Sequence, residues 1–334
     1  HKTELTSLVS NFENPVGADT CSSALAGDWT DPDVQNGNDD FDSLIGDSGS
    51  SYEIADLDAY LGKLYVAVSD TDADTKKTFF TFDIADPDDP TLISHKSIDN
   101  DATAESGISG IKVAGRYAFS ASARPANFET SSPDIPCDNS AGANASCGQM
   151  YVIDLGSNDA APAGISYTFQ VPGVTGIAGQ GIGNSIAYKD GYVYLGLTKT
   201  ASGPEFNIID VHAPTSPILV GSYAVGNAVN SILIKGRYAY LATPNDAELI
   251  VLDISNPAIP TDVGVERYDA PDNQGNGKSM YSVGDTLYFG RTVSSANPEF
   301  VVLDNEEQTE LQTNNATPKT IEIGSSVNKL LVRD

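Results

Sequence analysis

Residues 236–257 read Gly-Arg-Tyr-Ala-Tyr-Leu-Ala-Thr-Pro-Asn-Asp-Ala-Glu-Leu-Ile-Val-Leu-Asp-Ile-Ser-Asn-Pro. This stretch predicts a tight glycine turn, a short aromatic strand, an apolar strand that ends in aspartate, and a proline turn. Alternate residues of a strand share one face, so Tyr240 and Ala242 point the same way. A large and a small side chain side by side favour close packing against a neighbouring sheet.

The same phrase occurs five times along the chain. Its central aromatic residues, each followed two positions later by alanine or glycine, are Tyr65, Phe119, Tyr194, Tyr240 and Tyr288. The second strand of each copy ends at Asp83, Asp154, Asp210, Asp253 and Asp304, which are 71, 56, 43 and 51 residues apart. A period in the forties with insertions, without a helical pattern, is typical of a propeller. We therefore predict an all-β fold, a β-propeller of four-stranded antiparallel blades with five complete blades and a sixth begun.

The sixth blade is expected because residues 325–334 align with residues 227–236, which form the first strand of a copy. The chain ends where the second strand would begin. Residues 1–51 read as an acidic N-terminal extension, a loop or loosely packed, in which Leu5–Phe12 is the one strand-like run. The hypothesis is that residues outside this sequence or strand donation by a neighbouring protomer complete the ring. The propeller itself is expected over 52–334.

Composition limits the function classes. The 334 residues are 40% hydrophobic, which is enough for a large core, and carry a net charge of −28. Such a surface repels phosphate backbones and anionic lipids, so we expect no nucleic-acid partner and no direct membrane insertion. The two interpretations of the charge are plain solubility and the collection of divalent cations.

The stretch from Gly236 to Ala242 and the run from Leu249 to Pro257 together resemble the LVIVD repeat, and looser copies extend the resemblance over residues 52–334. The resemblance implies a β-propeller in a mostly bacterial, secreted or surface-attached protein, largely without assigned activity. Some members follow a pilin-like amino-terminal helix, but residues 1–50 show no pilin motif. The family supplies no catalytic residues to transfer.

The five strand-end aspartates are interpreted as structural turn acids rather than catalytic groups. A reaction needs such a carboxylate once, whereas a repeat needs it in every copy. A carboxylate after a strand can accept backbone N–H bonds in the following turn. The sequence has no metalloprotease, nucleophile-elbow or phosphate-loop motif, and we predict that the protein is not an enzyme.

Two other sites remain open at this level. Asp70, Asp72 and Asp74 alternate in a loop, which suits either a calcium site or a solvated acidic turn; no cofactor other than calcium is indicated. Cys137 and Cys147 flank a polar loop inside an insertion at 124–148, a spacing that allows a disulfide and leaves the partner of Cys21 open.

Three asparagines begin the first strand of a copy and are candidates to line the channel, with a repeated turn cap as the alternative: Asn184, Asn230 and Asn328. The expected function is that of a non-enzymatic structural or adhesive protein, extracellular or on the cell surface, with a surface filament as one setting. The alternatives are a propeller module that binds a glycan or peptide ligand and a metal-dependent enzyme that uses the channel.

Overall fold

The computed structural model describes residues 52–70, 78–86, 90–96, 108–122, 148–156, 164–174, 181–244, 248–263, 276–293, 298–304 and 319–330. These residues form five sheets of four strands, here called blades 1 to 5. In every blade the strands pair antiparallel in sequence order.

The bounds of the strands follow the repeat. Blade 1 contains β1 (Tyr52–Tyr60), β2 (Lys63–Asp70), β3 (Phe79–Asp83) and β4 (Thr91–Lys96). Blade 2 contains β5 (Ile108–Ala114), β6 (Tyr117–Ser122), β7 (Met150–Asp154) and β8 (Gly164–Phe169). Blade 3 contains β9 (Gly183–Lys189), β10 (Tyr192–Leu197), β11 (Phe206–Asp210) and β12 (Ile218–Tyr223). Blade 4 contains β13 (Ser231–Lys235), β14 (Tyr238–Ala242), β15 (Leu249–Asp253) and β16 (Thr261–Asp262). Blade 5 contains β17 (Gly277–Val283), β18 (Thr286–Arg291), β19 (Phe300–Asp304) and β20 (Lys319–Ile321).

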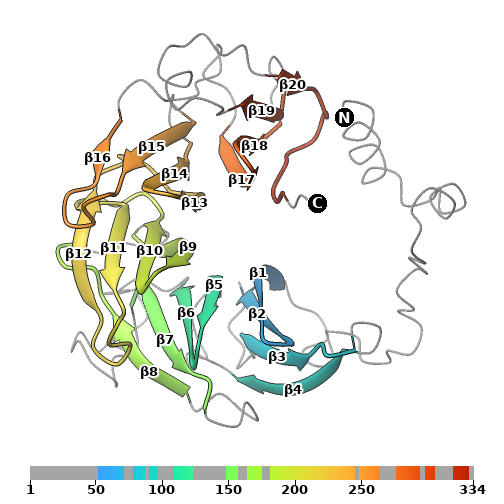
Figure 1. The fold of residues 1–334 in the computed structure, drawn as a ribbon, viewed down its shortest axis with the longest axis vertical. Helices are drawn as coiled ribbons and strands as arrows, with labels where there is room; N and C mark the ends of the chain where they lie inside the picture. Colours follow the sequence, from blue (N-terminus) through green and yellow to red (C-terminus); the bar gives the residue numbers. More distant parts are fainter. Residues whose placement is uncertain are drawn as a thin grey trace, which may run out of the picture.

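The blades are arranged around a centre, with the first strand of each blade innermost and the fourth outermost (Figure 1). The inner strands contact one another in the order β1, β5, β9, β13 and β17. The C-terminal segment enters the ring between β17 and β1 (Figure 1). The predicted propeller with five complete four-stranded blades is confirmed.

Tight hairpins join the first two strands of each blade. The turn Asp190-Gly191 has positive φ at both residues, 50° and 80°, as a type I′ turn requires. In the turn before β14, Gly236 has a φ of 57° while Arg237 is not among the positive-φ residues, as in a type II′ turn. Both turn types match the right-handed twist of the strands that they join.

The core consists mainly of the contacts between consecutive blades. Tyr194 of blade 3, for example, packs in one buried cluster with Ala239 and Leu241 of blade 4. The small residue after each aromatic lets the next blade approach: a Cβ added at Gly196 would lie 2.8 Å from Cβ of Val229. Among the described residues, no helix is long and apolar enough to cross a membrane.

Candidate functional site at the junction of blades 5 and 1

The junction between blades 3 and 4 provides the reference for a complete contact. Val229, two residues before β13, lies against Gly196, and its N–H donates to the carbonyl of Leu197 at 2.9 Å. The Ser185 hydroxyl donates to the Val229 carbonyl at 2.7 Å. Two backbone groups and one side chain of the incoming blade are thus held by the preceding blade.

Val327 makes the same contacts on blade 5. Its N–H donates to the carbonyl of Arg291 at 2.9 Å, and its carbonyl accepts from the Ser279 hydroxyl at 2.8 Å. Gly290 faces it, since an added Cβ would lie 2.6 Å from Cγ1 of Val327. Val327 therefore occupies the place on blade 5 that Val229 occupies on blade 3.

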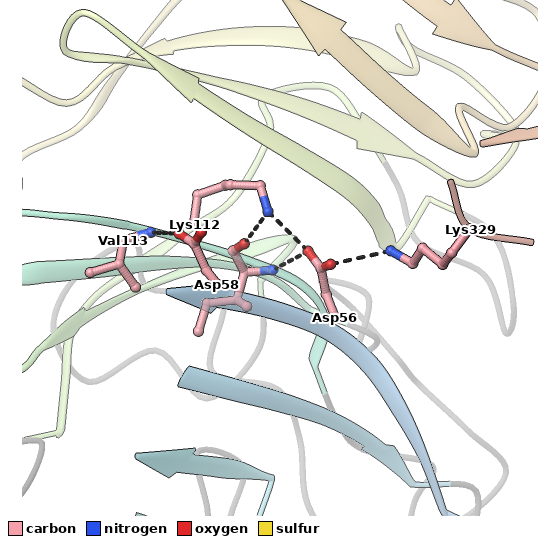
Figure 2. Close-up of polar contacts among 6 residues, drawn as sticks. Asp56, Asp58, Lys112, Val113 and Lys329 are labelled. Carbon is pink, nitrogen blue, oxygen red and sulfur yellow. Dashed lines mark hydrogen bonds and ion pairs between the residues drawn. The ribbon is translucent and has the colours of Figure 1, made fainter. Parts of the chain in front are cut away.

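Lys329 extends this segment to blade 1. Its Nζ lies 3.2 Å from Oδ1 of Asp56 on β1 (Figure 2). Residues 325–330 thus contact blades 5 and 1 and take the innermost place of a sixth blade. These residues form no backbone ladder with any described strand. Residues 331–334, the rest of the predicted strand, lie outside the described residues.

Asp56 and Asp58 fasten blade 1 to blade 2. Asp56 Oδ2 accepts from the N–H of Ile111 at 3.1 Å, and Asp58 Oδ2 accepts from the N–H of Val113 at 2.6 Å (Figure 2). Lys112 lies between them and donates to Asp56 Oδ2 at 3.3 Å. Two carboxylates of β1 therefore act as acceptors for alternate amides of β5, much as a neighbouring strand would.

The pKa values of the two carboxyl groups are shifted in opposite directions. Burial raises the pKa of Asp56, but the charges of Lys112 and Lys329 and the Ile111 N–H together outweigh it, so its pKa lies below the usual value. Burial also raises the pKa of Asp58, and there Lys112 and the Val113 N–H do not offset it. The cluster thus favours a charged Asp56 and disfavours a charged Asp58.

The predicted turn acids accept backbone hydrogen bonds from the residue two positions later. The donors to Asp83, Asp154, Asp210 and Asp253 are the N–H groups of Ala85, Gly156, His212 and Ser255, at 2.8 to 2.9 Å. These backbone bonds are the largest cause that lowers the pKa of Asp210 and of Asp253. Asp154 is also paired with Arg116 at 2.6 Å, which lowers its pKa most. The side chain of Asp304 lies outside the described residues.

A second set of polar residues with structural contacts was not predicted from the sequence. A buried polar residue stands directly before the third strand of every blade: Thr78, Gln149, Glu205, Glu248 and Glu299. Glu205 Oε2 accepts from the N–H groups of Val225 and Gly226, and Glu299 Oε2 accepts from those of Ile323 and Gly324. Three of the five are glutamates at the same place of the repeat, and this recurrence was the signal available in the sequence.

Glu248 has a different partner. It forms a two-bond pair with the guanidinium of Arg291, Oε1 to Nη2 at 2.6 Å and Oε2 to Nε at 2.8 Å. Arg291 also donates to the carbonyl of Pro298, and its side chain is fully buried. This ion pair joins blade 4 to blade 5, and both of its charged groups are buried.

The predicted channel asparagines lie at the inner ends of the blades. The Asn184 amide donates to the Val229 carbonyl at 2.9 Å, and the Asn230 amide donates to the Gly277 carbonyl at 2.7 Å. Both bonds cross from one blade to the next. Asn328 is exposed and stands between the two contacts of the C-terminal segment.

Several predicted sites fall outside the described residues: Cys137, Cys147, Asp72, Asp74 and the side chain of Asp70. Within the described ranges, no group of three or more histidine, cysteine, aspartate or glutamate side chains is placed to hold a metal ion. The calcium site and the disulfide stay predictions.

The fold and the repeated junctions define a β-propeller built from sequence repeats. The model of the LVIVD repeat matches residues 180–225 and 226–269, which contain blades 3 and 4. The chain therefore contains LVIVD repeats within a propeller, consistent with the LVIVD propeller family. A comparison with the curated proteins found no match.

Solved structures share the fold at low identity. A candidate 6-phosphogluconolactonase from Bacteroides uniformis is 12% identical with a TM-score of 0.52, over 84% of this chain and 74% of that one. The periplasmic gluconolactonase PpgL of Pseudomonas aeruginosa is 13% identical with a TM-score of 0.50, over 75% and 68%. The computationally designed protein Ika8 is 12% identical with a TM-score of 0.50, over 86% and 67%. At these identities the similarity shows the fold alone.

Proposed function

We propose that this protein is a non-enzymatic structural or adhesive component, extracellular or on the cell surface, whose copies associate with one another. The observation that carries the proposal is the junction of blades 5 and 1. There, residues 325–330 lie at the innermost place of a sixth blade, and no other described residues occupy that blade. A propeller protects its sheet edges when the ring is closed, so a blade position that the described residues fill only in part is a place for further chain to add.

Apolar side chains beside this junction, exposed on blade 1 and mostly buried on blade 5, support the proposal. Leu57 is 48% exposed, on the side of β1 opposite Asp56 and Asp58, and Ile54 of the same strand is 52% exposed. On blade 5, the rings of Tyr288 and Phe300 stack with centroids 6.1 Å apart, on the same strand face as Gly290. Apolar side chains thus flank the place of the sixth blade on both sides, which favours a β-sheet as the partner that adds there.

The hydrogen bonds and the ion pair made by the recurrent acidic residues support a structural role. Four strand-end aspartates and the buried Glu205 and Glu299 accept backbone N–H bonds, and Glu248 is held by Arg291. Carboxylates bound in this way fix turns and blade contacts.

The test is the mass of the purified protein by size-exclusion chromatography with light scattering, together with negative-stain electron microscopy. We expect assemblies of more than one copy, with a mass that rises with concentration. A particle that keeps the monomer mass of 35.0 kDa at every concentration would contradict the proposal.

Lactone hydrolysis is the second candidate, favoured by the names of two fold neighbours. An assay with gluconolactone and 6-phosphogluconolactone separates the two functions. Turnover well above spontaneous hydrolysis would favour an enzyme, and none is expected if the protein is structural.

A further inference from the structure

We propose that the inner ends of the blades bind a small oxyanion, a carboxylate or a phosphate, and that Lys278 is its principal contact. The site is a set of residues at one repeated place of the innermost strands, here called the bulge ring: Ala55, Ser109, Asn184, Asn230 and Lys278. This inference goes beyond self-association, because it concerns a small ligand at the centre of the propeller.

The ladder between the first two strands is interrupted at the same place in four of the five blades. A register shift there leaves one residue of the innermost strand opposite no residue of the second strand: Ala55, Ser109, Asn184 and Lys278. In blade 4 the same place, directly before β13, is that of Asn230. A bulge takes a side chain out of the alternation of its strand and re-aims it. The innermost strands lie nearest the centre of the ring, so the bulges concern residues at the centre (Figure 1).

Neighbouring members of the bulge ring contact one another. The Asn184 amide nitrogen lies 3.4 Å from the side-chain oxygen of Asn230. The Asn230 amide in turn donates to the carbonyl of Gly277, directly before Lys278, at 2.7 Å. Blades 3, 4 and 5 therefore bring two amides and one ammonium group to adjacent places around the inner ring.

The bulge ring is rich in donors and contains no acidic residue. It offers a hydroxyl, two amides and an ammonium group, and the ammonium group can only donate. The strands that carry the ring in blades 2 to 5 show the same bias, since β5, β9, β13 and β17 contain four lysines and no aspartate or glutamate. The whole chain has 46 acidic and 18 basic residues. Positive charge is thus concentrated on the inner strands of an acidic protein, which favours an anion as the ligand.

Three of these four lysines have partners in a neighbouring blade. Lys112 donates to Asp56, Lys189 to the carbonyl of Gly236, and Lys235 to the carbonyl of Gly284. Lys278 is half-buried and makes no hydrogen bond or ion pair with another described residue. Its ammonium group is therefore available to a ligand.

Lys278 also departs from the structural role of its place in the repeat. In blade 3 the Asn184 amide and the Ser185 hydroxyl both donate to the Val229 carbonyl. In blade 5 the Ser279 hydroxyl donates to the Val327 carbonyl, but Lys278 does not take the second bond. A repeated cap thus accounts for the asparagines and leaves the lysine unexplained, and such departures from a repeat are expected at functional sites.

Asp56 and Asp58 do not reverse the charge at the centre. Asp56 lies between two ammonium groups, with Lys112 at 3.3 Å and Lys329 at 3.2 Å (Figure 2). The pKa of Asp58 is raised by burial, which disfavours its charged form. Two lysines and one favoured carboxylate leave a net positive charge beside the bulge ring.

The donor set defines the class of ligand. An ammonium group pairs with a carboxylate or a phosphate oxygen in a charge-assisted hydrogen bond. The Ser109 hydroxyl makes no hydrogen bond with another described residue and is a further donor. Lysine acts as a point charge without the fixed fork of arginine, so it accepts either oxyanion and experiment must distinguish them.

The experiment is calorimetric titration of citrate and of inorganic phosphate into the full-length protein at constant ionic strength. Lys278→Asn places the residue of blades 3 and 4 in blade 5, where its amide can donate to the Val327 carbonyl, so the variant should fold. Lys319→Asn makes the same change of charge at an exposed residue of the outermost strand and is the matched control. We expect saturable binding to the wild type, about tenfold weaker binding to Lys278→Asn and unchanged binding to Lys319→Asn.

A second variant tests the ring from another blade. Ser109→Asp adds a carboxylate without breaking a bond to a described residue, and we expect it to weaken the binding of both probes. If Lys278→Asn does not fold, Ser109→Asp alone decides, and binding equal to the wild type then overturns the inference. The probe that binds more tightly identifies the oxyanion as a carboxylate or a phosphate.

Three other results would also overturn the inference: no saturable binding of either probe, wild-type affinity in Lys278→Asn, or an equal loss in Lys319→Asn. None of them bears on the proposed self-association, which is measured as mass in the absence of ligand. The failure of one is therefore distinguishable from the failure of the other.

Discussion

Gly196 and Gly290 hold equivalent positions, each facing a valine of the next segment, yet only Gly196 lies inside a complete blade junction. A methyl group at Gly196 would crowd Ser185, which pairs with Gly196 in the ladder of blade 3, and Val229, which stands two residues before the β13 ladder. At Gly290 the methyl group would crowd Ser279, which is in the ladder of blade 5, and Val327, whose segment forms no ladder with the described residues. Crowding costs most where the neighbour cannot move.

We therefore expect Gly196→Ala to lower the free energy of unfolding by about 1–3 kcal/mol in urea titrations. Gly290→Ala should cost less than Gly196→Ala, because Val327 can move away while Val229 cannot, and should increase amide exchange at residues 325–330. Equal global losses for the two variants would argue that the C-terminal segment is as firmly held as a complete blade.

The Asp56 cluster predicts a pH dependence. Because the folded-state pKa of Asp56 is lowered, its contribution is present above the unfolded-state value of about 3.9 and is lost as the pH falls through the folded-state pKa. The raised pKa of Asp58 acts in the opposite direction, since folding then favours its protonated form. We expect exchange at residues 325–330 to increase below about pH 4. Asp56→Asn should remove most of that acid response, and an unchanged response would contradict the role of Asp56.

At the scale of elements, the repeat predicted the two central strands of each blade, the hairpins and the turn acids, because all of these depend on residues close in sequence. The contacts of Asp56 with Ile111 and of Asp58 with Val113 were not predicted. They join residues 55 apart across two blades, and insertions of variable length hide the register. The pairing of Glu248 with Arg291 was not predicted either. Arg291 stands where blade 3 has Leu197 and blade 4 has Thr243, so the repeat does not indicate an arginine at this position.

The equivalent residues of other blades define a test of this ion pair. Arg291→Leu alone removes the guanidinium that pairs with the buried Glu248, and we expect a loss of about 3–5 kcal/mol in the free energy of unfolding. The double variant with Glu248→Gln places the residues that blades 2 and 3 have at these positions, Gln149 and Leu197, and should recover most of the loss. A double variant as unstable as the single one would show that the pair has no substitute in this junction.

At the scale of the whole molecule, five blades form four junctions with apolar cores, whereas the described residues connect blades 5 and 1 through a single segment. Its ion pair is weak, since the Lys329 side chain is 73% exposed and such pairs contribute about 0–1 kcal/mol. The sequence predicted that the sixth blade is begun. The structure adds where its first residues lie and which faces flank them.

The most direct test of the account is the mass of the purified full-length protein, measured by light scattering over a range of concentrations. If copies associate with one another, the mass should exceed the monomer mass of 35.0 kDa and rise with concentration. A mass that stays at the monomer value at every concentration would contradict the account.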